Sequence, residues 1–206
     1  FLGNASLALQ SIRKDDPIRA SVEDIETAAI RASELTHQML AYSGRASFTI
    51  KPVNINEAIQ ELTRILSVSI SKKAELRYEL DPHIPVIEGD ATQIRQVLMN
   101  LITNASDALE SESGTITIRT GAIKAEEVDR SLLPLNQQIA TGSYAYIEVA
   151  DTGTGMTNEV KERVFEPFFT TKRAGRGLGM SAVLGIVRSH GGVVQVQPEW
   201  RKGSVF

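Results

Sequence analysis

The sequence of 206 residues contains no cysteine. This absence excludes disulfide bonds, thiolate zinc sites and cysteine nucleophiles, and it fits a reducing compartment such as the cytoplasm. No apolar run approaches the roughly 18 residues that a helix needs to cross a bilayer, so we expect no membrane span in this chain. The formal net charge is only −3. The chain therefore has no general attraction to nucleic acid, and any polyanion must be held by a local site.

Histidine is scarce as well, and His37, His83 and His190 are the only three in the chain. A hydrophobic fraction of 42% is nevertheless enough to bury a core, which excludes wholesale disorder. A length of 206 residues favours one large domain, or one medium domain with an appendage.

Residues 1–46 have the pattern of a helical hairpin. A first helical segment ends at the turn Lys14-Asp15-Asp16-Pro17. In the second segment, apolar and small side chains recur at spacings of four and three: Ile18, Val22, Ile25, Ala29, Ala32, Thr36 and Met39. A single hairpin cannot bury such a seam alone. We therefore expect a homodimer in which two hairpins form a four-helix bundle.

The rest of the chain mixes strand and helix patterns without strict alternation, which predicts an α+β fold with one sheet covered by helices. The predicted strands are 48–53, 74–80, 85–88, 115–120, 144–150 and 193–197. The predicted helices are one that follows a cap at Asn54 or Asn56 and runs to about residue 69, and those at 91–109, 158–164 and 180–189. Residues 125–142 are interpreted as an exposed connection.

The helix predicted at 91–109 carries two asparagines. Asn100 and Asn104 are four residues apart, so their amides project from the same face. An amide oxygen can ligate Mg²⁺, which takes hard oxygen ligands and keeps waters and substrate phosphates in its shell. Taken alone, the pair is more typical of solvated or capping side chains on a helix surface.

A second motif lies where the strand at 144–150 ends in Asp151, followed by Gly153 and Gly155. A carboxylate in this position can accept a hydrogen bond from the exocyclic amine of adenine, and the glycines let the backbone approach a flat base. The same letters also fit an ordinary Asp-Gly turn, and the motif alone does not decide between these interpretations.

A third motif is the glycine-rich run 175–179 before the last helix, with Lys172, Arg173 and Arg176 beside it. Free N–H groups and the dipole at a helix N-terminus favour phosphate, whereas a flexible linker is the alternative. No strand pattern precedes the run, so it is not a dinucleotide-binding fingerprint. Residues 165–169 supply three of the six phenylalanines. We interpret this predicted plug as apolar side chains that pack against the core and anchor a mobile loop.

In this order, the four segments resemble the catalytic and ATP-binding domain of sensor histidine kinases, in the GHKL ATPase superfamily. Residues 100–105 resemble the N box, 151–155 and 175–179 the two glycine boxes, and 165–169 the F box. The resemblance implies a Bergerat α/β sandwich over residues 48–206, with a nucleotide lid over about 157–177. It also implies that residues 1–46 are part of the hairpin that serves dimerisation and histidine phosphotransfer.

The resemblance assigns roles in binding ATP and Mg²⁺ to individual residues. Asn104 would ligate Mg²⁺, Asn100 would support the phosphate end, and Asp151 would bind the adenine amine. The base pocket would be shaped by Gly153, Gly155 and Met156. Backbone N–H groups of Gly177, Leu178 and Gly179 would bind the phosphates, with Thr171 and Lys172 beside them. Asn100 and Lys172 are the candidate catalytic residues.

One position distinguishes kinases from hydrolases in this superfamily. Hydrolytic members carry a glutamate one helical turn before the magnesium-binding asparagine, where it activates water as a general base. Here that position is Asn100, which cannot take a proton. The sequence therefore favours a phosphotransferase over an ATPase.

None of the three histidines has the setting of a phosphoacceptor. Residues 1–5 resemble the stretch that follows the acceptor histidine in the family, so we expect the acceptor upstream of Phe1 and a response regulator as the partner that receives the phosphoryl group. The alternatives are a GHKL-type ATPase, a protein-serine kinase, and a non-catalytic module that binds nucleotide and dimerises.

Overall fold

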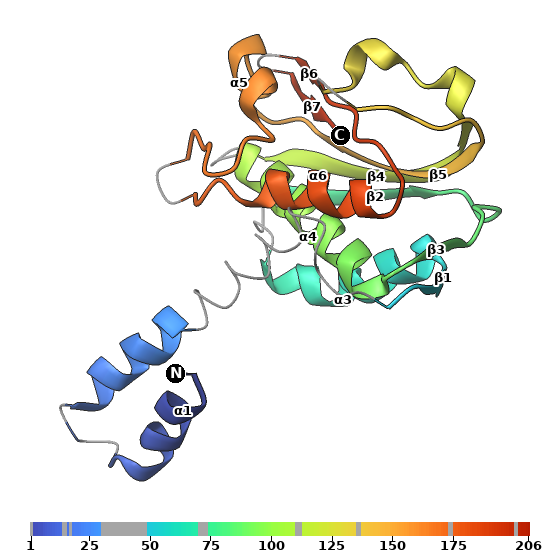
Figure 1. The fold of residues 1–206 in the computed structure, drawn as a ribbon. Coiled ribbons are helices and arrows are strands. Elements are labelled where there is room, and N and C mark those ends of the chain that lie inside the picture. The colour runs from blue at the N-terminus through green and yellow to red at the C-terminus, as the bar shows by residue number, and fades with distance from the viewer. Residues whose placement is uncertain are drawn as a thin grey trace. The chain divides into compact units, whose positions relative to one another are not determined.

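A computed structural model of the chain describes residues 2–13, 16, 18–29, 49–69, 74–109, 113–134, 137–172, 175–199 and 202–206. The chain divides into two compact units, Phe1–Ala46 and Ser47–Phe206, and Figure 1 shows the elements of each. Within the described residues, no helix is both long and apolar enough to cross a membrane.

The first unit contains helix α1 (Leu2–Ser11) and a second helical stretch over residues 18–29. The Arg19 guanidinium ties them together, because its Nη1 donates to the carbonyls of Leu9 and Ile12 at 3.1 and 3.2 Å. These are carbonyls at the end of α1, where a helix leaves acceptors without partners. The expected continuation of the second helix to Met39, including His37, lies outside the described residues.

The core of the second unit is a five-stranded sheet with the order β2-β4-β5-β7-β6. Its strands are β2 (Ala74–Leu80), β4 (Gly114–Lys124), β5 (Ser143–Asp151), β6 (Gln197–Glu199) and β7 (Gly203–Val205). The β2–β4 pair is parallel and the other pairs are antiparallel. Two further strands, β1 (Lys51–Val53) and β3 (Ile87–Gly89), form a small antiparallel sheet.

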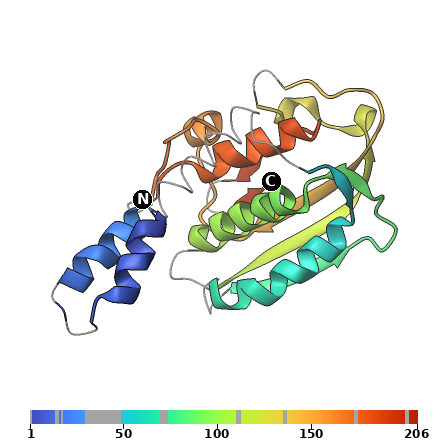
Figure 2. The same cartoon turned by 60° about the horizontal axis from the view of Figure 1, so that its bottom comes forward.

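Three helices lie side by side as a layer over the large sheet, as Figure 2 shows: α3 (Ile55–Ser69), α4 (Ala91–Ala108) and α6 (Gly179–Ser189). Helix α4 is central, since it contacts α3, α6, β4 and β5. Its buried residues recur at helical spacing, and Asp90 caps it by accepting from the N–H groups of Thr92 and Gln93. Asn54, one of the two predicted caps, begins α3 by accepting from the N–H of Asn56 at 3.0 Å. This arrangement is the predicted α+β fold.

The strand predicted at 193–197 is wrong in its position. Residues 193–196 are not in a strand, and β6 begins only at Gln197. The N–H of Val194 bonds to the Gln137 side chain at 2.9 Å, and the N–H of Val196 bonds to the Leu132 carbonyl at 3.2 Å. Partners outside the sheet therefore take the hydrogen bonds that a strand ladder would need.

Residues 125–142 form the predicted connection, and most of its described residues are exposed. The connection contains two short 3₁₀ helices, η1 (Ala125–Glu127) and η2 (Arg130–Leu132). Ala125 and Val128 are buried. The connection also bonds to the segment before β6, through Gln137 to the Val194 carbonyl and through Gln195 to the Asp129 carbonyl. The two buried side chains and these hydrogen bonds are the features that the sequence pattern did not predict.

Candidate nucleotide-binding site

One face of α4 brings the three polar motifs together. The Nδ2 atom of Asn100 donates to the Gly179 carbonyl at 3.2 Å, and Asn104 Oδ1 accepts from Lys172 Nζ at 2.7 Å. The Ala108 carbonyl accepts from the N–H of Thr154 at 3.0 Å. The three α4 positions are four residues apart and so lie on one face over two successive turns, about 12 Å from end to end. Asn100 and Asn104 contact the second glycine motif and the lysine beside it, and Ala108 contacts the first glycine motif.

Asp151 lies at the end of β5 and is buried, with 8% of its surface exposed. Its Oδ1 accepts from the N–H of Gly153 at 2.8 Å. Burial raises the pKa of this carboxyl, and it outweighs the lowering by the backbone N–H groups of Gly153 and Ser204 and by the charge of Lys172. The carboxylate is thus a poorly hydrated acceptor, suited to a specific hydrogen bond.

Gly153 and Gly155 have different structural reasons to be glycine. A Cβ on Gly153 would lie 2.4 Å from the carbonyl oxygen of Ala108, so only glycine lets this loop approach α4. Gly155 has φ +65°, in the left-handed region that favours glycine. The sequence predicts glycine here because the backbone must approach a flat base. The close approach of Gly153 to Ala108 is a second reason, which comes from packing inside the domain. Met156 is half-buried beside them.

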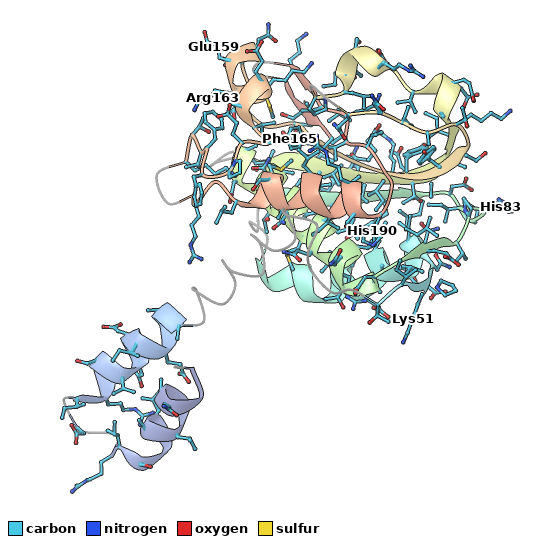
Figure 3. All side chains as sticks on the ribbon, in the orientation of Figure 1. Lys51, His83, Glu159, Arg163, Phe165 and His190 are labelled. Carbon is cyan, nitrogen blue, oxygen red and sulfur yellow. The ribbon has the colours of Figure 1, made fainter. Side chains whose placement is uncertain are left out.

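The segment after the first glycine motif begins with helix α5 (Asn158–Arg163), which Thr157 caps. Phe165 follows α5 (Figure 3) and is buried. Its ring lies edge-to-face against that of Phe206, with the ring centroids 6.5 Å apart. The Arg163 guanidinium stacks over the Phe169 ring at 4.3 Å. Phe168 is exposed and has φ +68°. Of the three phenylalanines in the predicted plug, Phe165 is therefore the one that is buried in the core.

The second glycine motif is hydrogen-bonded to the same phenylalanine segment. The N–H of Phe168 donates to the Gly177 carbonyl at 2.8 Å. Gly177 has φ +67°, and a Cβ there would lie 2.4 Å from the Phe168 carbonyl carbon. Leu178 is buried and precedes α6, whose first residue is Gly179. The first N–H groups of a helix lack partners within it, so this end of α6 is suited to bind an anion.

Lys172 lies next to the Asn104 amide and also pairs with Asp107. Its Nζ is 2.8 Å from Asp107 Oδ2, on the same α4 face. Asp107 was not among the predicted site residues, although it lies three residues after Asn104 and so shares its face. An amide oxygen with a carboxylate nearby is a donor set that fits Mg²⁺ with waters and phosphates completing the shell. Thr171 is exposed in the same loop.

Neither of the two described histidines is placed near these motifs. His83 is exposed in the loop after β2. His190 ends α6 (Figure 3). Its Nε2 accepts from the N–H of Asp90 at 3.0 Å, and its Nδ1 donates to the Ile186 carbonyl at 2.8 Å. Both ring nitrogens of His190 are thus engaged by the backbone.

Comparison with known proteins gives consistent results. Residues 89–206 match the family model described as histidine kinase-, DNA gyrase B-, and HSP90-like ATPase. The sensor kinase CckA of Brucella abortus is 34% identical over 205 residues, which cover 98% of this chain and 21% of that protein. The sensor histidine kinase ZraS of Salmonella typhi is 31% identical over 179 residues, which cover 86% of this chain and 35% of that protein.

Solved structures share the fold. The full-length ShkA structure superposes with a TM-score of 0.72 at 24% identity, covering all of this chain and 41% of that one. The catalytic domain of the histidine kinase ThkA superposes with a TM-score of 0.59 at 30% identity, covering 77% of this chain and 93% of that one. The present chain spans well under half the length of CckA and ZraS. It belongs to the histidine kinase-, DNA gyrase B- and HSP90-like ATPase family and carries the GHKL catalytic domain of a sensor histidine kinase.

Proposed function

We propose that the chain binds Mg-ATP along the α4 face and donates the γ-phosphoryl group to a histidine, for relay to an aspartate of a response regulator. The observation that carries the proposal is the series of contacts at Asn100, Asn104 and Ala108. It sets Asp151 near one end of a track of about 12 Å and the α6 N-terminus near the other. Adenine would bind at the first end and the phosphates at the second.

The chemistry would rest on positioning and charge. Asn104 would hold Mg²⁺, which neutralises phosphate charge when it is bound. The N–H groups of Gly177, Leu178 and Gly179 would bind phosphate oxygens, and Lys172 would add positive charge beside them. Asn100 and Thr171 would support the phosphate end, and Gly153, Gly155 and Met156 would shape the base pocket. Such a site aligns the γ-phosphoryl group without forming a covalent bond to this domain.

Phosphotransfer is favoured over hydrolysis by the contact of Asn100. Its Nδ2 donates to the Gly179 carbonyl. A glutamate at this position has no N–H to donate, and its carboxylate would face that carbonyl oxygen. The amide thus fits the local geometry and cannot act as a general base for water. The same site in a protein-serine kinase or a non-catalytic module would bind nucleotide equally, and the acceptor distinguishes these functions.

The acceptor histidine is proposed to lie outside these 206 residues. His190 is held by the backbone at both nitrogens, and His83 is in a loop without a neighbouring motif. The partners are proposed to be a second copy of the chain, through residues 1–46, and a response regulator. ThkA has been solved in complex with a response regulator protein, and ShkA with AMPPNP.

The nucleotide site can be tested by measuring Mg-ATP affinity by calorimetry for Asn104→Ala and Asp151→Asn. Each change should weaken binding at least about tenfold. Asn104→Ala removes the proposed metal ligand, and the amide of Asp151→Asn, with its oxygen held by the Gly153 N–H, would turn a donor toward the donor amine of adenine. Asn4→Ala and Asp24→Asn, exposed in the first unit, are matched controls that should bind as the wild type does. Unchanged affinity in both site variants would show that the assignment is wrong.

The reaction can be tested with γ-labelled ATP. The chain alone should bind the nucleotide but form no phosphohistidine. The substrate is a longer copy of the protein that carries the acceptor histidine and the substitution Asp151→Asn, so that it cannot bind ATP itself. This copy should be labelled by the 206-residue chain. Phosphohistidine on the 206-residue chain itself would contradict the proposed location of the acceptor. Steady release of phosphate without labelled protein would favour the ATPase alternative.

A further inference from the structure

The contact between Lys172 and Asn104 uses the oxygen that the proposed function assigns to Mg²⁺. Lys172 Nζ lies 2.7 Å from Asn104 Oδ1. A magnesium ion on that oxygen would lie at about 2.1 Å from it, and hence within about 5 Å of the ammonium. A divalent ion and an ammonium at such a distance repel each other. The arrangement of Lys172 seen in the structure and a metal on Asn104 are therefore in competition.

Asp107 holds Lys172 in this arrangement. Its Oδ2 is 2.8 Å from the same Nζ atom, so the ammonium is shared between an amide oxygen and a carboxylate. Asn104 and Asp107 are three residues apart on α4, which lets both side chains reach one cation. The pair is partly exposed, with 38% of the Lys172 side chain and 58% of the Asp107 side chain accessible. A contact of this kind is weak enough to be replaced by a ligand.

We propose that Asp107 is a positioning residue that holds Lys172 on Asn104 in the nucleotide-free chain, so that Lys172 competes with Mg²⁺ for the amide oxygen. Binding of the metal–nucleotide complex moves the ammonium off Asn104. The carboxylate of Asp107 thereby raises the Mg²⁺ concentration at which nucleotide binds. This inference rests on the proposed function, since it requires that Asn104 binds the metal of Mg-ATP.

The alternative role for Asp107 has the opposite consequence. A carboxylate this close to Asn104 could instead attract Mg²⁺ or bond to its waters, and its removal would then raise the Mg²⁺ requirement. The competition with Lys172 predicts that removal lowers it. The direction of one measured shift therefore separates the two roles.

The test is the Mg²⁺ concentration at half-saturation for binding a fluorescent ADP analogue, measured on the full chain with and without Asp107→Asn. We expect the substitution to lower this concentration about two- to fivefold, the range for an ion pair this exposed. In a Lys172→Met background, Asp107→Asn should produce no such decrease, because the competing ammonium is gone. Glu88→Gln, which removes one negative charge near the other end of α4, is the control and should not change it.

An unchanged or raised half-saturation in Asp107→Asn would overturn the inference, as would an equal decrease in the Lys172→Met background. Failure of the proposed function would give a different result. In that case, nucleotide binding by the wild type would not depend on Mg²⁺, or Asn104→Ala would leave the Mg²⁺ dependence unchanged. Circular dichroism of each variant checks that it is folded. A decrease that depends on Lys172 supports the assignment of Asp107.

Discussion

At the scale of single residues, Asp151 combines a buried position with a charge. The fold gives its carboxylate the N–H groups of Gly153 and Ser204, but burial dominates and raises its pKa. A buried carboxylate lowers the stability of the fold, because its oxygens have lost hydrogen bonds from water. It also makes binding selective, because a ligand amine can donate a hydrogen bond in place of that water. The site thus carries a local stability cost at the residue that would recognise the base.

This cost predicts the pH dependence of Asp151→Asn. A raised pKa means that the folded chain holds this proton more tightly than the unfolded chain does. Stability from Asp151 therefore falls as the pH rises from the ordinary aspartate value of 3.8 through the raised pKa. The amide has no such titration, so Asp151→Asn should be more stable than the wild type at pH 7, and the difference should shrink toward acid pH. Urea unfolding midpoints between pH 4 and 7 measure it.

Asp129→Asn is the matched control with the opposite sign. Hydrogen bonds from the Ser131 hydroxyl and N–H lower the pKa of Asp129. Its contribution to stability is present above the ordinary pKa and is lost as the pH falls through the lowered one. Asp129→Asn should therefore be slightly less stable than the wild type at pH 7. A loss of stability at pH 7 in Asp151→Asn would contradict the argument.

The site residues that could be predicted from sequence are those that a local sequence pattern places on a helix face or at the end of a strand. Asn100 and Asn104 share a helix face, and Asp151 ends a strand pattern, so local periodicity places them. Asp107 could not be singled out, because its role depends on Lys172, 65 residues away in the chain. The roles of these residues toward ATP and Mg²⁺ stay predictions.

At the scale of elements, the start of α4 and the end of α6 are joined by His190. Its Nε2 accepts from the N–H of Asp90, the residue that caps α4. The carboxylate of Asp90 also accepts from the N–H of Thr49, just before β1. Gly89 makes room for the ring, because a Cβ there would lie 2.8 Å from His190 Cδ2. One imidazole thus joins the two helices that carry the candidate site.

Substitutions at this joint should be coupled. Gly89→Ala should destabilise the chain by about 1–3 kcal/mol through overpacking against the ring. His190→Ala should cost about 1–3 kcal/mol, since it leaves the Asp90 N–H without its partner. The double variant should lose clearly less than the sum, because the added methyl group then occupies space that the ring has left. Urea unfolding of the four proteins measures the coupling.

Gly3→Ala is the control for replacing a glycine. Gly3 lies in the first turn of α1 with open space around its position, and alanine there should stabilise the helix by up to about 0.5 kcal/mol. Additive losses for Gly89→Ala and His190→Ala would show that the ring contact does not limit this position.

The elements that could be predicted are those with long internal patterns. The predicted strand at 74–80 is β2, and the predicted helix at 91–109 differs from α4 by one residue at its end. Short elements depend on partners that are distant in sequence. β6 and β7 have three residues each, and Val194 and Val196 bond to Gln137 and Leu132 of the preceding connection instead of to a strand. No local pattern contains that information.

At the scale of the whole molecule, the two units contrast in how they bury their apolar residues. The second unit has a closed core, with Leu98, Ile116 and Ile118 fully buried. In the first unit, Leu7, Ile18 and Ile25 are 63%, 61% and 55% exposed among the described residues. Two of these belong to the seam that the sequence pattern predicts. The four-helix bundle of two hairpins stays a prediction, and the exposed seam is the surface that it would bury.

Ile18→Glu combined with Ile25→Glu should therefore convert the chain from dimer to monomer. Burying one isoleucine contributes about 1.5–3 kcal/mol, and each change occurs in both copies, so the dimer dissociation constant should rise at least about a hundredfold. Sedimentation velocity over a concentration series measures it. Val86→Glu, at an equally exposed apolar residue of the second unit, should leave the dimer intact. Because both glycine motifs contact α4 of the second unit, the double variant should keep its Mg-ATP affinity. A wild-type chain that is monomeric at every concentration, or a double variant that still dimerises, would exclude this seam as the interface.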